Sequence, residues 1–209
     1  MNEPVGIPAV ILAGGQSRRM GGGDKCLQEL GGRRMLDHVI VRIAPQAAPL
    51  ALNANGPAAR FAAFGLPVLA DPLPGQPGPL AGVLAAMHWA AGLGAPQVVT
   101  VAGDTPFFPT DLVARLAAGA GPGGLALAAT EDAIRGTLRQ PTFGIWPVDL
   151  RDDLRAALAG GLRKVVAWTG SHGAADVVFA TPGGVDPFFN VNTPEDLADA
   201  RARVGEPGA

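Results

Sequence analysis

A glycine-rich loop near the start of the chain contains the residue types that bind phosphate. Residues 12–25 read Leu-Ala-Gly-Gly-Gln-Ser-Arg-Arg-Met-Gly-Gly-Gly-Asp-Lys and follow the apolar residues 7–12 directly. Glycine lets successive backbone N–H groups turn toward one anion and approach its oxygens closely. Arg18, Arg19 and Lys25 add positive charge around these amides. The pattern predicts a polyphosphate site, with an ordinary strand-to-helix turn carrying solvated arginines as the alternative.

Two widespread phosphate-binding loops do not match this segment. A Walker A loop places Ser or Thr after its lysine, whereas Cys26 follows Lys25 and Asp24 precedes it. The Gly-x-Gly-x-x-Gly pattern of dinucleotide-binding turns is also missing from this loop, which disfavours a nicotinamide or flavin enzyme. The loop therefore belongs to a third class.

Short polar side chains stand at several points where apolar segments end. One such residue alone is usually a turn former or a helix cap. In a mostly parallel sheet, however, ligands bind at the carboxyl ends of the strands, so a set of these residues predicts a site. The set comprises Asn53, Asp71, Asp104, Asn190 and Asn192, the last two flanking Val191.

Asp104 follows the apolar residues 98–102 and precedes Thr105 and Pro106. A carboxylate beside bound phosphates repels them unless a cation lies between, and Mg²⁺ commonly takes one or two carboxylates together with substrate phosphates. We therefore predict that Asp104 holds Mg²⁺, with a helix cap as the alternative. Asn192 is the candidate second metal ligand, directly or through water.

Alternating apolar segments predict an α/β fold. Periodicity and breaker residues favour a mostly parallel central sheet with helices on both faces, formed as a single domain over residues 1–209. Thr110 is expected to cap a short helix, and Thr193 to cap one that starts at Pro194. Strands are expected at 7–12, 49–53, 67–70, 97–102, 125–129, 142–146 and 177–180, and further helices at 36–43, 80–92 and 149–158.

Composition limits the class of protein. The net charge of −2 disfavours a nucleic-acid binder, although six of the sixteen cations fall between residues 18 and 42 and could form a focused positive cleft. The one cysteine, Cys26, excludes an internal disulfide, and we expect it to be a small buried thiol. No secretory signal or long apolar run is evident, so we expect a cytoplasmic protein that does not enter a membrane.

Taken together, the motifs resemble those of the molybdenum cofactor guanylyltransferases, within the Leu-Ala-Gly-Gly nucleotidyltransferase group. The resemblance covers nearly the whole chain, through residues 12–15, 19–21, 24–25, 71, 78–82, 104–106 and 189–197. It implies a three-layer, Rossmann-like nucleotidyltransferase fold, with 1–105 mainly binding nucleotide and 106–209 mainly binding the acceptor. It also implies that GTP and molybdopterin are the substrates, that the product carries GMP and that Asp104 holds Mg²⁺. The GTP-binding residues it implies are Leu12, Ala13, Gly14, Gly15, Lys25, Asn53, Asp71 and Asp104.

Two features bear on which nucleotide base the chain would bind: one residue of the loop motif and one carboxylate. Leu-Ala-Gly-Gly is more typical of the guanylyl branch than of cytidylyl and sugar relatives, and Asp71 could accept hydrogen bonds from guanine N1–H and the 2-amino group. The chain departs from many relatives at Gln140, where a histidine is usual, which puts a pterin contact there in doubt.

The expected chemistry needs no strong general base, because the attacking phosphate oxygen is already anionic. Catalysis then depends on positioning and charge neutralisation, with Arg19, Lys25 and Asp104 as the catalytic residues. The three histidines, His38, His88 and His172, are expected to have structural roles or to lie on the surface. Arg163 and Lys164 either contact the pterin phosphate or end a helix.

Other functions remain open from the sequence. A sister enzyme on the same scaffold could use CTP with molybdopterin, or transfer a nucleotide to a sugar phosphate or to phospholactate. A GTP-binding adaptor that delivers cofactor would be a non-enzymatic alternative. Transient contact with molybdoenzymes or other proteins of cofactor biosynthesis is expected in either case.

Overall fold

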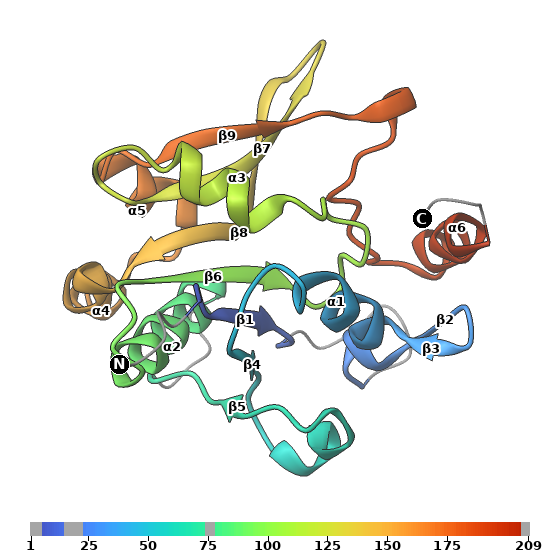
Figure 1. Cartoon of the computed structure of the whole chain (residues 1–209), viewed down its shortest axis with the longest axis horizontal. Helices are drawn as coiled ribbons and strands as arrows, with labels where there is room; N and C mark the ends of the chain where they lie inside the picture. Colours follow the sequence, from blue (N-terminus) through green and yellow to red (C-terminus); the bar gives the residue numbers. More distant parts are fainter. Residues whose placement is uncertain (1–5, 15–22, 74–77, 206–209) are drawn as a thin grey trace.

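The computed structural model describes residues 6–14, 23–73 and 78–205. A seven-stranded sheet runs through the molecule in the order β5-β4-β1-β6-β8-β7-β9, which Figure 1 shows from bottom to top. All neighbours pair in parallel except β8, which is antiparallel to both β6 and β7. The strands are β1 (Ala9–Leu12), β4 (Leu50–Asn53), β5 (Val68–Leu69), β6 (Gln97–Ala102), β7 (Ala126–Asp132), β8 (Gly136–Pro147) and β9 (Ala175–Phe179).

Helices cover both faces of this sheet. Successive strand residues alternate between two apolar clusters: Ala9 and Ile11 belong to one, and Val10 between them belongs to the other. Because side chains alternate across a strand, the two clusters lie on opposite faces. The expected three-layer α/β arrangement is confirmed. Helices α1 (Met35–Ile43) and α3 (Leu112–Gly119) pack into the first cluster, and α2 (Pro79–Gly92), α4 (Arg151–Ala159) and α5 (Val165–Ser171) into the second.

The strand order reverses between β1 and β6. The chain goes from β1 to β4 and β5 on one side, and then crosses to β6 on the other side of β1. Connections that leave two neighbouring parallel strands in opposite directions open a crevice at their carboxyl ends. The sheet therefore prepares a binding site beyond Leu12 and Ala102, where the paired strands β1 and β6 end together.

Strand β8 contains an irregularity close to this edge. Leu127 of β7 pairs with Gly144, but the next residue, Ala128, pairs with Gln140, so residues 141–143 lie outside the regular register. Beyond this point the β7–β8 hairpin projects away from the rest of the sheet (Figure 1).

A third, smaller cluster lies beside the sheet. Helix α6 (Pro194–Val204) packs there against the hairpin of β2 (Glu29–Leu30) and β3 (Arg33–Arg34), around the buried Val191. The predicted cap of α6 is confirmed, because the Asp196 amide donates to Thr193 Oγ1 at 3.1 Å and the Thr193 amide donates back to the Asp196 carboxylate at 2.9 Å.

Some expectations from the sequence were wrong in detail. Helix α3 has Asp111 rather than Thr110 as its N-cap, because the first helical bond runs from the Arg115 amide to the Asp111 carbonyl. Asn190 and Asn192 were grouped with residues that follow strands but stand at no strand end; the Val191 amide between them donates to the Asp104 carbonyl. Helix α5, the β2–β3 hairpin and four 3₁₀ segments were not predicted: η1 (Lys25–Leu27), η2 (Ala58–Phe64), η3 (Val148–Leu150) and η4 (Pro182–Gly184). In the part of the chain that the structure describes, none of the helices combines the length and the apolar character that a membrane span requires.

Candidate active site

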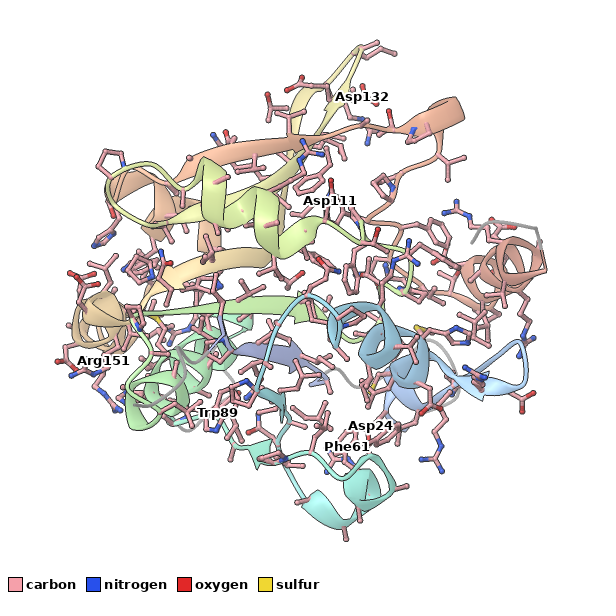
Figure 2. The ribbon with its side chains drawn as sticks, viewed as in Figure 1. Asp24, Phe61, Trp89, Asp111, Asp132 and Arg151 are labelled. Atoms are coloured by element: carbon pink, nitrogen blue, oxygen red, sulfur yellow. The ribbon has the colours of Figure 1, made fainter. Side chains whose placement is uncertain are left out.

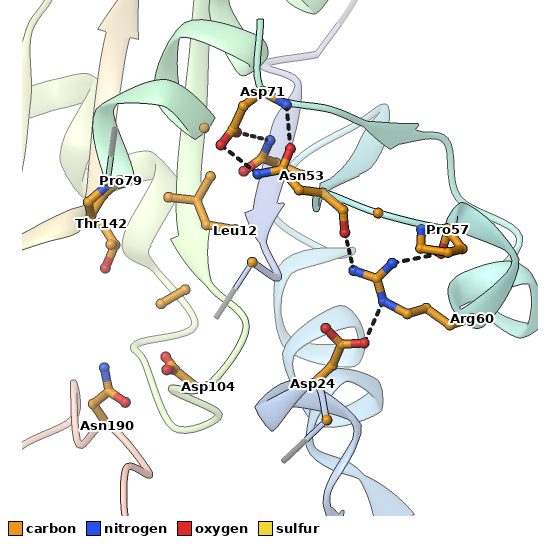
Figure 3. A pocket seen from close by; sticks show the side chains of 17 residues that line it. Leu12, Asp24, Asn53, Pro57, Arg60, Asp71, Pro79, Asp104, Thr142 and Asn190 are labelled. Atoms are coloured by element: carbon orange, nitrogen blue, oxygen red, sulfur yellow. Dashed lines mark hydrogen bonds and ion pairs between the residues drawn. The ribbon is translucent and has the colours of Figure 1, made fainter. Parts of the chain in front are cut away.

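A cavity of about 700 Å³ opens at the crevice beyond β1 and β6 (Figure 3). Its walls come from the ends of three parallel strands, the start of α2, the irregular part of β8 and the loop before α6. The lining residues are Leu12, Gly14, Gly23, Asp24, Asn53, Asn55, Gly56, Pro57, Arg60, Asp71, Gly78, Pro79, Gly82, Ala102, Asp104, Thr142 and Asn190.

One wall presents the Asp71 carboxylate, held by two asparagines (Figure 3). Asn53 Nδ2 donates to Asp71 Oδ1 at 3.0 Å and to the Leu69 carbonyl at 3.1 Å. Asn55 Nδ2 donates to Asp71 Oδ2 at 2.7 Å, and Asn55 Oδ1 accepts from the Asp71 amide at 3.0 Å. A carboxylate oxygen accepts more than one hydrogen bond, so Asp71 is fixed in place and can still accept from a ligand.

This wall requires the glycine at position 82 of α2. A Cβ there would lie 2.4 Å from Asn53 Oδ1 and 2.9 Å from Leu12 Cδ2, both closer than real Cβ contacts. Asn53 is only 6% exposed, so it has little room to move aside. The Gly-Pro-Leu-Ala-Gly motif of the sequence thus ends in a residue that lets the helix approach β1 and β4.

The opposite part of the cavity is lined by Asp104 and Asn190, and the Lys25 ammonium bonds to both without being a lining residue itself. Lys25 Nζ donates to Asp104 Oδ2 at 2.5 Å, to Asn192 Oδ1 at 2.6 Å and to Asn190 Oδ1 at 3.2 Å. The bond from the Val191 amide to the Asp104 carbonyl fixes the two asparagines beside the end of β6. Three residues predicted as catalytic or metal-binding, Lys25, Asp104 and Asn192, therefore meet at one point.

The three oxygens around Lys25 suit a divalent cation. They are one carboxylate and two amide carbonyls, which are hard donors of the kind that Mg²⁺ binds. The described residues include no group of three or more His, Cys, Asp or Glu able to hold a metal, so such a site depends on the asparagines. An ammonium and a metal ion cannot share one position, and direct metal binding here requires Lys25 to turn away.

Of the other predicted loop residues, some line the cavity and one is buried behind it. Leu12 and Gly14 line the cavity. Ala13 is buried, its amide donating to the Asn53 carbonyl at 2.9 Å, so its side chain supports the strand end rather than the cavity wall. Gly15 and Arg19 lie outside the described residues.

Cys26 is the buried thiol that the sequence predicts. It is 3% exposed, and its Sγ lies 3.7 Å from the Ala13 carbonyl. Burial, with the nearby charges of Asp24 and Asp104, raises its pKa from 9.0 to about 12. The thiol therefore stays protonated near neutral pH and is no nucleophile.

Among the cavity-lining residues that sequence reasoning missed, Asn55 and Arg60 make the hydrogen bonds that hold the wall together. A signal for Asn55 was present: Asn53-Ala-Asn55 has the same spacing as Asn190-Val-Asn192, and alternate residues of an extended segment point to the same side. Arg60 has no comparable signal, since its partners lie at separations of 3, 5 and 36 residues.

The histidines have structural contacts, as the sequence predicts. His38 Nε2 lies 2.7 Å from the Leu30 carbonyl, His88 pairs with Arg155 and His172 pairs with Asp153. None of them lines the cavity described above.

The two basic residues considered for the pterin phosphate stand between two helices. Arg163 donates to the Leu158 and Leu162 carbonyls at 2.8 and 2.7 Å, which favours the helix-end interpretation. Lys164 is the N-cap residue of α5.

Solved structures share this fold. A molybdopterin-guanine dinucleotide biosynthesis protein A from Archaeoglobus fulgidus superposes with a TM-score of 0.73 at 21% identity, covering 95% of this chain and 98% of that one. A 4-diphosphocytidyl-2C-methyl-D-erythritol synthase from Anaerococcus prevotii gives a TM-score of 0.75 at 14% identity, covering 97% of each chain. At these identities the likeness establishes the shared fold and nothing finer.

Sequence comparison is more specific. The family model described as "MobA-like NTP transferase domain" matches residues 9–178. A molybdenum cofactor guanylyltransferase from Mesorhizobium japonicum is 50% identical over 200 residues, covering 93% of this chain and 94% of the relative. One from a Bradyrhizobium species is 51% identical over 199 residues, covering 93% and 91%. With the fold and the cavity already described, these matches establish that the chain belongs to the molybdenum cofactor guanylyltransferases, a family of nucleotidyltransferases.

Proposed function

We propose that this chain transfers GMP from GTP to molybdopterin and releases pyrophosphate, forming the guanine dinucleotide form of the molybdenum cofactor. The observation that carries the proposal is one cavity with a cation-centred cluster at one part and a fixed carboxylate at another. The names of the curated relatives supply guanylyl transfer as the reaction class.

The two parts of the cavity suit the two ends of GTP. Asp71 offers carboxylate oxygens to the guanine N1–H and 2-amino donors, while Asn53 and Asn55 keep it in place. The amides of residues 12–15 and the charges of Arg19 and Lys25 would hold the triphosphate.

Magnesium fits the donor set of Asp104 and Asn192, with Asn190 beside them. When bound, the ion would offset negative charge on the phosphate oxygens. Lys25 would then donate to the triphosphate rather than to Asp104, so the same ammonium stabilises the carboxylate before binding and the leaving group afterwards.

In the transfer step, an oxygen of the terminal phosphate of molybdopterin forms a bond to the α-phosphorus of GTP. The bond from this phosphorus to the oxygen bridging it to the β-phosphate breaks, and the electron pair leaves with pyrophosphate. The nucleophile needs no deprotonation, so the chain contributes orientation and charge stabilisation.

The acceptor is proposed to enter from the side formed by residues 106–209. Thr142 and Asn190 are the cavity-lining residues that come from this half, and the other lining residues come from residues 12–104. The irregularity of β8 at residues 141–143 brings Thr142 into the wall. A cytoplasmic location and transient delivery to molybdoenzymes belong to the same proposal.

Pyrophosphate release tests this function. With molybdopterin and Mg²⁺, the wild type should turn over with GTP and far less with CTP, ATP or UTP. Lys25→Met and Asp104→Asn should each lower turnover by on the order of 10²–10³-fold, the usual effect of losing one preorganised electrostatic contact. Near-normal turnover in a folded variant would contradict the assignments, a preference for CTP would indicate a cytidylyltransferase, and GTP binding without pyrophosphate release would indicate an adaptor.

A further inference from the structure

Arg60 lies in the cavity wall, and each of its three guanidinium nitrogens donates one hydrogen bond (Figure 3). Its Nε donates to Asp24 Oδ2 at 2.5 Å, its Nη1 to the Pro57 carbonyl at 2.7 Å and its Nη2 to the Asn55 carbonyl at 2.5 Å. The guanidinium carbon also stands 4.6 Å from the centre of the buried Phe61 ring. Figure 2 places Asp24 and Phe61 in the same part of the molecule, beside η2. The side chain is therefore fixed by four contacts.

These contacts join the two parts of the candidate site. Asp24 precedes Lys25 in the chain and is the N-cap residue of η1, the segment that carries the Lys25 ammonium. Asn55 holds Asp71 through both its amide nitrogen and its amide oxygen. One guanidinium thus connects the segment of Lys25 with the segment that fixes the Asp71 carboxylate, which otherwise belong to separate strand ends.

We propose that Arg60 is a positioning residue that sets the spacing between Asp71 and Lys25, so that the base and the triphosphate of GTP bind in register. The inference rests on the proposed function, which places guanine at Asp71 and the phosphates at Lys25. Arg60 directs three of its five N–H donors to Asp24 and to two backbone carbonyls, so its hydrogen bonds hold the two segments that carry Lys25 and Asp71.

An arginine is required for this geometry. The planar guanidinium carries five N–H donors in a fixed fork and can reach a carboxylate and two carbonyls in different directions. A lysine would keep the ion pair with Asp24 but would lose the fork that also reaches Asn55 and Pro57. The side chains of Arg60 and Asp24 are 25% and 19% exposed, so water competes only in part for these bonds.

Ligands that occupy one part or both parts of the cavity separate positioning from direct binding. GMP reports on the base wall, inorganic tripolyphosphate with Mg²⁺ reports on the phosphate loop, and GTP with Mg²⁺ requires both in register. We would measure the three affinities by NMR titration, which follows millimolar binding, in the wild type and in Arg60→Gln. GTP should weaken about tenfold, equal to 1.4 kcal/mol, while GMP and tripolyphosphate change less than about twofold.

Two further variants complete the experiment. Arg60→Lys should weaken GTP binding by about half as much as Arg60→Gln on the logarithmic scale, because the lysine keeps only the ion pair with Asp24. Arg115→Gln is the matched control: Arg115 likewise stacks on a phenylalanine, at 4.1 Å from Phe179, and donates to the Val178 carbonyl, but it does not line the cavity. It should leave all three affinities unchanged.

Several results would overturn the proposal. Loss of tripolyphosphate binding in parallel with GTP would make Arg60 a direct phosphate ligand. Equal loss of all three ligands in Arg60→Gln and Arg60→Lys would make it a general structural residue. An unchanged GTP affinity in Arg60→Gln would show that Arg60 has no role in GTP binding. Failure of the proposed function gives a different result, because the wild type would then bind GTP no better than CTP under the same conditions.

Discussion

Glycine 82 gives the strictest test of how the Asp71 wall is built. In Gly82→Ala the new methyl must push Asn53 Oδ1, 2.4 Å away, and Leu12 Cδ2, 2.9 Å away, out of their positions. Overpacking of this kind costs about 1–3 kcal/mol. Displacing the Asn53 amide also removes its bonds to Leu69 and Asp71, each contributing about 1 kcal/mol.

The gain in helix propensity opposes these losses. Alanine is favoured over glycine inside a helix by about 1 kcal/mol. The expected net change is a loss of about 2–4 kcal/mol in the free energy of unfolding, measured by urea denaturation. GTP affinity should fall in the folded variant, because Asp71 loses one of its two amide partners.

Gly92 of the same helix provides the control. A Cβ there meets no atom within 4 Å, so Gly92→Ala should stabilise the protein by up to about 1 kcal/mol and leave GTP affinity unchanged. Equal stability changes in the two variants, or wild-type GTP affinity in Gly82→Ala, would refute the close approach of α2 to Asn53.

Three other perturbations have expected outcomes. Thr100→Val should cost about 1–3 kcal/mol in denaturation, since it leaves the buried Trp146 indole N–H without its 2.8 Å acceptor; an unchanged midpoint would contradict this. Thr193→Ala removes the acceptor of the Asp196 amide and should cost about 0.5–2 kcal/mol in the same assay. Cys26, whose pKa is raised to about 12, is protonated when folded but ionises above pH 9.0 when unfolded. Its contribution to stability should therefore be complete below pH 9 and decline as pH rises toward 12, and Cys26→Ala should flatten that decline. Rapid labelling of the native thiol at pH 8 would contradict its burial.

The sequence predicts the layers of the fold because they depend on local patterns. Strand β6 has the predicted bounds, 97–102, since a segment rich in valine lies between the breakers Pro96 and Gly103. Helix α5 escaped prediction because its seven residues are too few to show a periodicity, and they are held by the packing of Val165 and Trp168 against the sheet. Tertiary contacts decide such short elements.

In the candidate site, too, local sequence patterns predict some residues and tertiary contacts decide the others. Asp71 and Asp104 are visible in the sequence because each ends an apolar segment at the edge where a parallel sheet binds ligands. The meeting of Lys25 with Asn190 and Asn192 is not visible, because it spans 165 and 167 residues and depends on how α6 packs. Arg60 was missed for a similar reason, since a surface helix rich in alanine gives no hint that one arginine turns inward.

A crystal structure with GTP and Mn²⁺ in place of Mg²⁺ tests the central claim most directly, because the anomalous signal of manganese locates the ion without ambiguity. We expect guanine N1 and the 2-amino group within hydrogen-bond distance of the Asp71 carboxylate, manganese at Asp104 and Asn192, and Lys25 turned onto the triphosphate. A nucleotide bound in the reverse direction, or outside the cavity between Asp71 and Asp104, would contradict it.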